Sequence, residues 1–146
     1  MSPRHLPLVS LLLAVACSGP VGLLPGGALD GPEQPAPADW TFAGSAGTAQ
    51  LETRPDEPYS VNLAYTILGG RLYVNAGDTE TQWVENMSAD PRVRLRVDGN
   101  VYALRAERVT DAAELDAFGA AWTSQSLFRR DPRKLEEVWV YRLVAR

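Results

Sequence analysis

Cysteine and histidine are nearly absent: the sequence of 146 residues contains one of each. An internal disulfide needs two cysteines and a Cys/His zinc site needs several such ligands, so both are excluded. The histidine, His5, lies in an N-terminal segment that we expect to be removed, which leaves no histidine base for nucleophilic catalysis. No spaced carboxylate motif indicates a metal site. Any redox chemistry would therefore come from a bound cofactor.

An excess of basic charge and a long apolar run are also lacking. The formal net charge is −4 and the basic residues are spread along the chain, which argues against a nucleic-acid partner. The apolar stretch from Leu6 to Ala16 is shorter than the roughly 20 residues that a membrane-spanning helix needs. Because Arg4 precedes it and small residues end it, residues 1–16 are typical of a signal peptide.

The lone cysteine, Cys17, directly follows that segment. The preceding residues, Leu13-Ala14-Val15-Ala16, resemble the lipobox of bacterial lipoproteins, in which the thiol takes a diacylglyceryl group, although Ala14 departs from the usual leucine. The alternative is an ordinary peptidase site that cuts the same bond and leaves a free thiol. We expect lipidation, export and attachment to the membrane through this lipid. Ser18 is not the aspartate that commonly retains lipoproteins on the inner membrane, so we expect the outer membrane if the cell has one.

Composition divides the rest of the chain in two. Residues 17–39 are rich in proline, glycine and alanine, and such a segment buries too little apolar surface to offset the cost of ordering it. We therefore predict a tether there. Residues 40–146 are long enough for one domain with a modest core.

The clearest element of the domain is a hairpin over Val93–Val109. Two alternating apolar runs flank Asp98-Gly99, a pair suited to a two-residue turn. A two-residue turn at this pair sets a register that puts the large apolar side chains on one face. The expected cross-strand pairs are Val97–Asn100, Leu95–Tyr102 and Val93–Leu104.

The other face of this hairpin gathers arginines. We interpret it as a solvated or salt-bridged outer face, on which Arg94→Asp would be mild. The alternative is a surface that binds an anion or a partner. The four residues are Arg92, Arg94, Arg96 and Arg105.

Further strands and two helices follow from periodicity and turn residues. Together they predict a mainly β (α+β) fold, a small antiparallel barrel with two short-to-medium helices. The expected strands are Ala49–Thr53, a hairpin over Tyr59–Ala76 that turns at Gly69-Gly70, and Glu137–Ala145; the expected helices are Thr79–Met87, with Thr79 and Gln82 as a capping box, and one that starts near Thr110 or Asp111 and carries Leu115, Phe118 and Trp122 on one face.

The stretch from Gly70 to Asp111 resembles the split β-barrel superfamily of pyridoxamine-phosphate-oxidase-like proteins and deazaflavin-dependent nitroreductases. The motif residues are Gly70-Arg71-Leu72-Tyr73-Val74, then Trp83, Asn86 and Met87, then Asp90-Pro91-Arg92-Val93. The resemblance implies a small antiparallel split β-barrel over about residues 50–146. It also implies a homodimer that builds its cofactor site between subunits.

Each motif residue also has a structural interpretation. Pro91 cannot continue a helix and holds Asp90 extended, so this pair ends a helix in any protein. Asn86 is suited to a hydrogen bond at the helix end, and Met87 to the core. For Trp83 we favour packing under the barrel over contact with a ligand.

The resemblance implies FMN or a deazaflavin coenzyme as cofactor. In flavin-binding members a Ser or Thr hydroxyl, a Lys or Arg, and the helix N-terminus hold the phosphate. Here the hydroxyl falls on Thr81, with Thr79 nearby, but the basic position falls on Trp83. The nitroreductase loop Gly-Arg-Lys-Ser-Gly is replaced by residues 53–58, where Arg54 alone keeps the positive charge. Arg54 or Arg71 would then have to compensate.

Two functions stay open. One is an envelope-anchored reductase of an unidentified small molecule that uses flavin or deazaflavin. The other is a split-barrel binding or scaffold module on the cell envelope that holds no cofactor.

Overall fold

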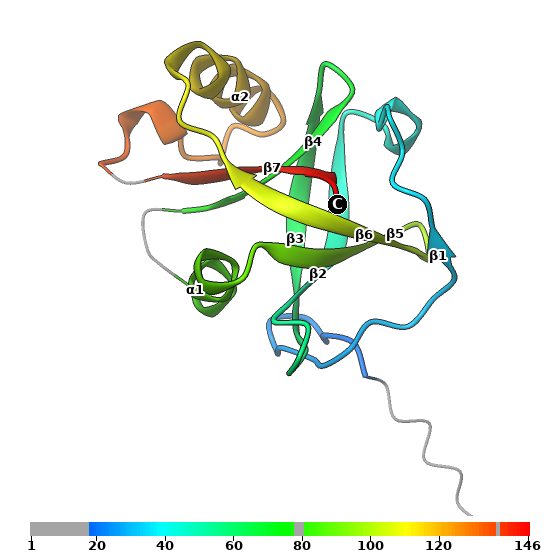
Figure 1. Cartoon of the computed structure of the whole chain (residues 1–146). Coiled ribbons are helices and arrows are strands. Elements are labelled where there is room, and N and C mark those ends of the chain that lie inside the picture. Colours follow the sequence, from blue (N-terminus) through cyan, green and yellow to red (C-terminus); the bar gives the residue numbers. More distant parts are fainter. Residues whose placement is uncertain (1–17, 78–80, 137) are drawn as a thin grey trace, which may run out of the picture.

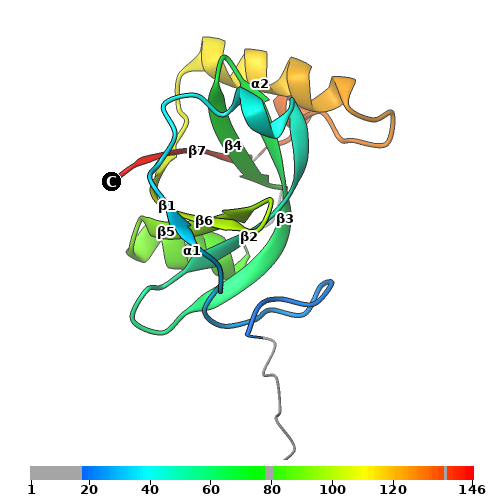
Figure 2. The same ribbon diagram turned by 90° about the vertical axis from the view of Figure 1, so that its right-hand side faces the viewer.

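The computed structural model of the chain describes residues 18–77, 81–136 and 138–146. Six antiparallel strands in the order β6-β5-β2-β3-β4-β7 form a barrel, which a β6–β7 pairing closes. Figure 2 looks into this barrel, and Figure 1 shows the helices outside it. The described strands are β1 (Glu33–Gln34), β2 (Ala46–Thr53), β3 (Tyr59–Leu68), β4 (Arg71–Ala76), β5 (Arg92–Val97), β6 (Asn100–Arg108) and β7 (Trp139–Ala145).

The predicted fold class and both hairpins are confirmed. Strands β5 and β6 pair in the expected register, with Leu95 opposite Tyr102. Asp98 and Gly99 take the left-handed backbone conformation that the turn requires, with φ of 50° and 83°. Gly69 and Gly70 do the same between β3 and β4, at φ of 57° and 73°.

The helices lie close to their predicted positions. Helix α1 (Gln82–Ala89) begins at Gln82 rather than Thr79, with Thr81 as N-cap, and the Thr81 side chain makes no capping hydrogen bond. The expected capping box rests on Thr79, which lies outside the described residues. Helix α2 (Ala112–Ser124) begins as predicted, because the Asp111 carboxylate accepts the Glu114 amide at 2.9 Å. None of the described helices has the length and apolar character needed to cross a membrane.

Two apolar cores lie on opposite sides of the strands β4 and β7. Leu72, Val74 and Tyr141 face the barrel interior, whereas Tyr73 and Val140 face α2. The last strand, β7, is therefore covered on both sides. The α2 layer packs through Phe118, which is fully buried. The short 3-10 segments are η1 (Thr41–Ala43) and η2 (Pro132–Lys134).

The arginine face of the β5–β6 hairpin is salt-bridged, in agreement with the interpretation that we favoured. Arg92 pairs with Asp90 at 2.7 Å, and Arg105 with Glu107 at 2.6 Å. Asp90 ends α1 and Arg92 begins β5, as Pro91 predicts.

Residues 18–39 are not a detached tether, which corrects the prediction for this segment. Leu29 is 3% exposed, and β1 pairs in parallel with β6. Gly26 and Ser60 exchange two backbone hydrogen bonds at 2.9 and 2.8 Å. The segment is ordered because the barrel supplies, from distant positions in the sequence, the apolar cover and hydrogen-bond partners that its own composition lacks.

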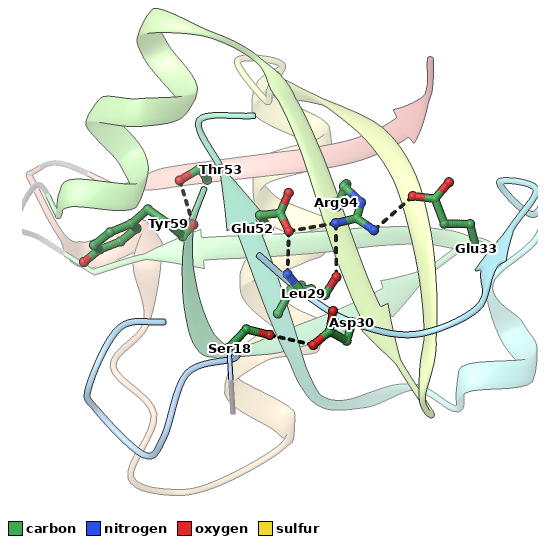
Figure 3. A network of polar contacts seen from close by, with 8 residues as sticks. All are labelled: Ser18, Leu29, Asp30, Glu33, Glu52, Thr53, Tyr59 and Arg94. Atoms are coloured by element: carbon green, nitrogen blue, oxygen red, sulfur yellow. Dashed lines mark hydrogen bonds and ion pairs between the residues drawn. The ribbon is translucent and has the colours of Figure 1, made fainter. Parts of the chain in front are cut away.

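A buried carboxylate holds this segment, as Figure 3 shows. Glu52 on β2 accepts the backbone amide of Leu29 at 2.7 Å and a hydrogen bond from Arg94 at 2.9 Å. Arg94 also donates to the Leu29 carbonyl at 3.2 Å and to Glu33 at 2.9 Å. The Glu52 side chain is 4% exposed and that of Arg94 is 21% exposed. Arg94 is therefore a partly buried clamp, which overturns the expectation that Arg94→Asp would be mild.

Candidate functional site

The N-terminus of α1 is the position at which the family resemblance puts the phosphate of the expected cofactor. Thr81 precedes the helix in extended conformation, and its hydroxyl oxygen is buried with no hydrogen-bond partner among the described residues. The first amides of a helix lack intrahelical partners and carry the positive end of the helix dipole. Thr81 and these amides therefore form a donor set that fits a phosphate oxygen.

Trp83 lies in the barrel core. Trp83 is 8% exposed, and its ring packs edge to face against the Tyr141 ring at a centroid distance of 6.4 Å. Val84 and Met87 share this core, as predicted. Trp83 thus fixes α1 against the barrel, and it contributes no charge at the position where flavin-binding relatives carry a basic residue.

Arg54 lies beside α1 but is engaged within its own turn. It has a φ of 59°, its Nε donates to the Glu57 carbonyl at 3.0 Å, and its guanidinium lies 5.7 Å from the Tyr59 ring centroid. The Asn86 amide donates to the Thr53 hydroxyl at 3.0 Å, which ties this turn to the helix. The guanidinium of Arg54 is therefore held within the β2–β3 turn by Glu57 and Tyr59.

Arg71 is separated from the other predicted residues. It begins β4, whereas the connection to α1 leaves the other end of that strand after Ala76. Five residue steps of a strand cover about 17 Å. Its guanidinium instead lies 3.8 Å from Glu114 on α2. Arg71 does not share a site with Thr81.

Glu114 anchors α2 to the barrel at this other end. It accepts hydrogen bonds from Tyr73 at 2.6 Å and from Arg142 at 2.7 Å. Burial alone would raise the pKa of Glu114, but these hydrogen bonds and the charges of Arg142 and Arg71 hold it below its usual value. Burial, together with the hydrogen bond to Glu114, raises the pKa of the Tyr73 phenol. The cluster is a structural junction between α2, β4 and β7.

A cleft at the far end of β4 was not predicted from the sequence. Asn75, Ala76 and Gly77 line it on one side, and the segment after α2 lines it on the other. There the Arg129 guanidinium lies 3.5 Å over the Trp122 ring, and the Trp122 indole donates to the Arg130 carbonyl at 3.2 Å. Phe128 is 96% exposed beside them. Burial lowers the pKa of Arg129, although it remains charged.

The sequence carried only a weak signal for this cleft. Phe128, Arg129 and Arg130 follow one another in the chain, but their approach to β4 depends on how the segment folds back after α2. Aromatic and cationic side chains together suit a planar anionic ligand. The described residues contain no group of three or more His, Cys, Asp or Glu side chains that could hold a metal ion.

The chain matches a family of known proteins. The family model described as F420H(2)-dependent quinone reductase matches residues 54–127, a span from the β2–β3 turn through α2. Among curated proteins, none matches the chain.

Solved structures share the fold at low identity. An F420 reductase aligns with a TM-score of 0.51 and 16% identity over 76% of this chain and 96% of that one. A FAD-binding protein of Mesorhizobium loti aligns with a TM-score of 0.50 and 21% identity, over 67% of this chain and 78% of that one. A pyridoxamine 5'-phosphate oxidase-like protein of Listeria innocua aligns with a TM-score of 0.52 and 17% identity, over 67% of this chain and 82% of that one. These likenesses establish the split barrel.

Proposed function

Since the chain belongs to the family of F420H(2)-dependent quinone reductases, we propose that it is an envelope-anchored reductase that uses a deazaflavin or flavin coenzyme. The observation that carries the proposal is the hydroxyl of Thr81 at the N-terminus of α1, which is buried and has no hydrogen-bond partner among the residues that the structure describes. The resemblance to flavin-binding split barrels assigns the phosphate-binding hydroxyl to this residue, which supports the proposal. The coenzyme, when bound, would supply hydride transfer.

The protein's own residues would bind and orient the coenzyme. Thr81 and the first amides of α1 would hold its phosphate by hydrogen bonds. The positive charge would come from Arg54, released from Glu57, or from Arg129 at the end of β4. Trp122 and Phe128 would offer aromatic surface and exclude water from the cleft.

Binding should be measurable but weak, because Trp83 replaces the basic residue of flavin-binding relatives. A charge-assisted hydrogen bond contributes about 1.5–3 kcal/mol, so its loss lowers affinity about ten- to a hundredfold. The acidic residues Asp56 and Glu57 beside Arg54 add no attraction for a phosphate. Millimolar coenzyme should be included in the titration.

The test is a fluorescence and absorbance titration of residues 18–146 with coenzyme F420 and, separately, with FMN. Thr81→Val should reduce binding, whereas Thr48→Val, an exposed threonine on β2, should not. Arg54→Ala and Arg129→Ala should identify which arginine supplies the charge. Arg71→Ala is the matched control because Arg71 lies at the opposite end of β4. Equal affinities for all variants would contradict the proposed site.

A second function has one specific observation in its favour. Arg54 bonds to Glu57, and Trp83 packs in the barrel core. Neither of the two positions at which the related families carry a basic side chain therefore offers a free positive charge. A binding or scaffold module without a cofactor would not need a basic side chain at either position. Absence of binding of either coenzyme at millimolar concentration would favour this module over the reductase.

We also propose that Cys17 carries a lipid that attaches the protein to the envelope. Its position directly after the predicted signal peptide, and directly before a segment that bonds to the barrel, supports this anchor. Metabolic labelling with a radioactive or clickable fatty acid would detect it. Export without label would favour the ordinary peptidase site.

A further inference from the structure

We propose that the hairpin Val21–Leu24 is a second membrane contact, which inserts its leucines into a lipid bilayer beside the anchor and so orients the barrel. The proposal rests on the lipid at Cys17 and not on the coenzyme. The leucines would insert at the boundary between the headgroups and the acyl chains of a phospholipid leaflet.

The hairpin presents apolar side chains to solvent. Val21 and Leu24 exchange backbone hydrogen bonds at 3.1 and 2.9 Å, and Gly22 takes a φ of 57°, which suits the first central position of a tight turn. Leu23 is 102% exposed, Leu24 is 70% exposed and Val21 is 62% exposed. The turn therefore holds three large apolar side chains away from the barrel core.

Hydrogen bonds tie the hairpin and its base to β3. The Asn62 amide donates to the carbonyls of Pro20 and Gly22, at 3.4 and 3.0 Å. Gly26 bonds to Ser60 on the same strand. A side chain at Gly26 would collide with the backbone of Gly19, so the two arms of the hairpin lie in close contact.

The base of the hairpin is the point at which the described chain begins. The amide of Gly27 donates to the Ser18 carbonyl at 2.6 Å, and the Ser18 hydroxyl donates to Asp30 at 2.6 Å. A lipid on Cys17, the preceding residue, would therefore leave the protein at this base. Five residue steps from Ser18 to Leu23 span at most about 17 Å. A bilayer that holds the lipid thus lies within reach of the leucines.

The charge pattern suits a lipid surface. No charged residue occurs between Arg4 and Asp30, so nothing in the hairpin opposes burial in an apolar phase. Leu127 is 101% exposed on the loop after α2, two residues before Arg129. That loop (orange) lies at the other end of the molecule from the hairpin (blue) in both views (Figures 1 and 2). Leu127 is therefore a matched control for exposure without proximity to the anchor.

The test supplies the anchor artificially, so that it does not depend on lipidation in cells. Residues 18–146 contain every described strand, helix and core residue and no cysteine. This protein, with an N-terminal polyhistidine tag, is attached to phosphatidylcholine vesicles that contain a nickel-chelating lipid. Leu23→Cys and Leu127→Cys variants each carry an environment-sensitive nitrobenzoxadiazole label.

We expect the label at residue 23 to shift to shorter wavelength on the vesicles and to be quenched by lipids with a nitroxide on the acyl chain, and the label at residue 127 to do neither. Leu24→Ser in the Leu23→Cys background should weaken this insertion about tenfold. A label at residue 23 that stays water-like would overturn the proposal. So would equal shifts at both positions, or a shift without vesicles that grows with protein concentration, since the latter would identify a second copy as the occupant. None of these outcomes depends on coenzyme binding.

Discussion

Removal of the Arg94 guanidinium should destabilise the protein far more than its place on an arginine-rich outer face suggests. Arg94→Ala leaves the Glu52 carboxylate, which is 4% exposed, with the Leu29 amide and without its charged partner. Loss of one member of a buried ion pair costs about 3–5 kcal/mol. Because the Arg94 side chain is 21% exposed and water can partly replace it, we expect about 2–4 kcal/mol. Arg94→Asp should cost more, because it places a second carboxylate beside Glu52.

The control is Arg105→Ala, which removes an arginine from the same face. The Arg105 side chain is 49% exposed and its partner Glu107 is 30% exposed, so we expect a change within about 1 kcal/mol. In a double-mutant cycle, Glu52→Gln keeps an oxygen for the Leu29 amide but needs no counter-charge. Arg94→Ala should then cost less than half as much as in the native background.

Urea unfolding followed by tryptophan fluorescence measures these free energies of unfolding, and limited proteolysis reports release of residues 18–34. Arg94→Ala should lower the Tm by roughly 10 °C and expose this segment to cleavage. Equal urea midpoints for Arg94→Ala and Arg105→Ala would refute the buried clamp. Additive effects in the cycle would refute the coupling between Arg94 and Glu52.

Four further predictions concern other parts of the molecule. Leu95→Asp should lower the free energy of unfolding by about 4–5 kcal/mol, because Leu95 is fully buried in the barrel. A urea midpoint near that of the native protein would contradict the register. Glu114 has a lowered pKa, so its stabilisation is present above the unfolded-state value and is lost as pH falls through the folded value; the Tm difference between native protein and Glu114→Gln should shrink on acidification, and a constant difference would be inconsistent with this. Cys17→Ser should move the protein from the membrane to the soluble fraction, and unchanged sedimentation with membranes would rule out the lipid anchor. Analytical ultracentrifugation of residues 18–146 at tens of micromolar, by order of magnitude, should show a homodimer, and a monomer would remove a cofactor site shared between subunits.

Local sequence signals were reliable where a few adjacent residues decide the structure. Asp98-Gly99 and Gly69-Gly70 set two hairpins, and the period of two in the flanking residues set the register, since a slip by one residue would expose Leu95 and bury arginines. Pro91 likewise ended α1 and began β5. In these places the turn chemistry and the apolar pattern agree.

The candidate site could be predicted only in part. Thr81 is the N-cap of α1, close to the predicted helix start at Thr79, because a helix start is largely a local property. The grouping of Arg54, Arg71 and Thr81 was not local, and the structure places Arg71 at the opposite end of β4. Arg129 reaches the end of β4 through a loop whose path depends on how α2 packs, through Phe118, against Tyr73 and Val140.

Period, turn residues and composition were sufficient to predict a small antiparallel barrel of hairpins, the approximate positions of both helices and the exclusion of disulfides and Cys/His zinc sites. Three features depend on the folded barrel: residues 18–39 are bound to it, Glu52 and Arg94 form a buried clamp, and the Val21–Leu24 leucines remain in solvent. Each of these depends on partners more than twenty residues away. The Ser60 backbone bonds to Gly26, and the side chains of Asn62 and Arg94 bond to this segment, and these contacts form only once the strands have paired. Composition describes what a segment can bury by itself, whereas the barrel decides what covers it.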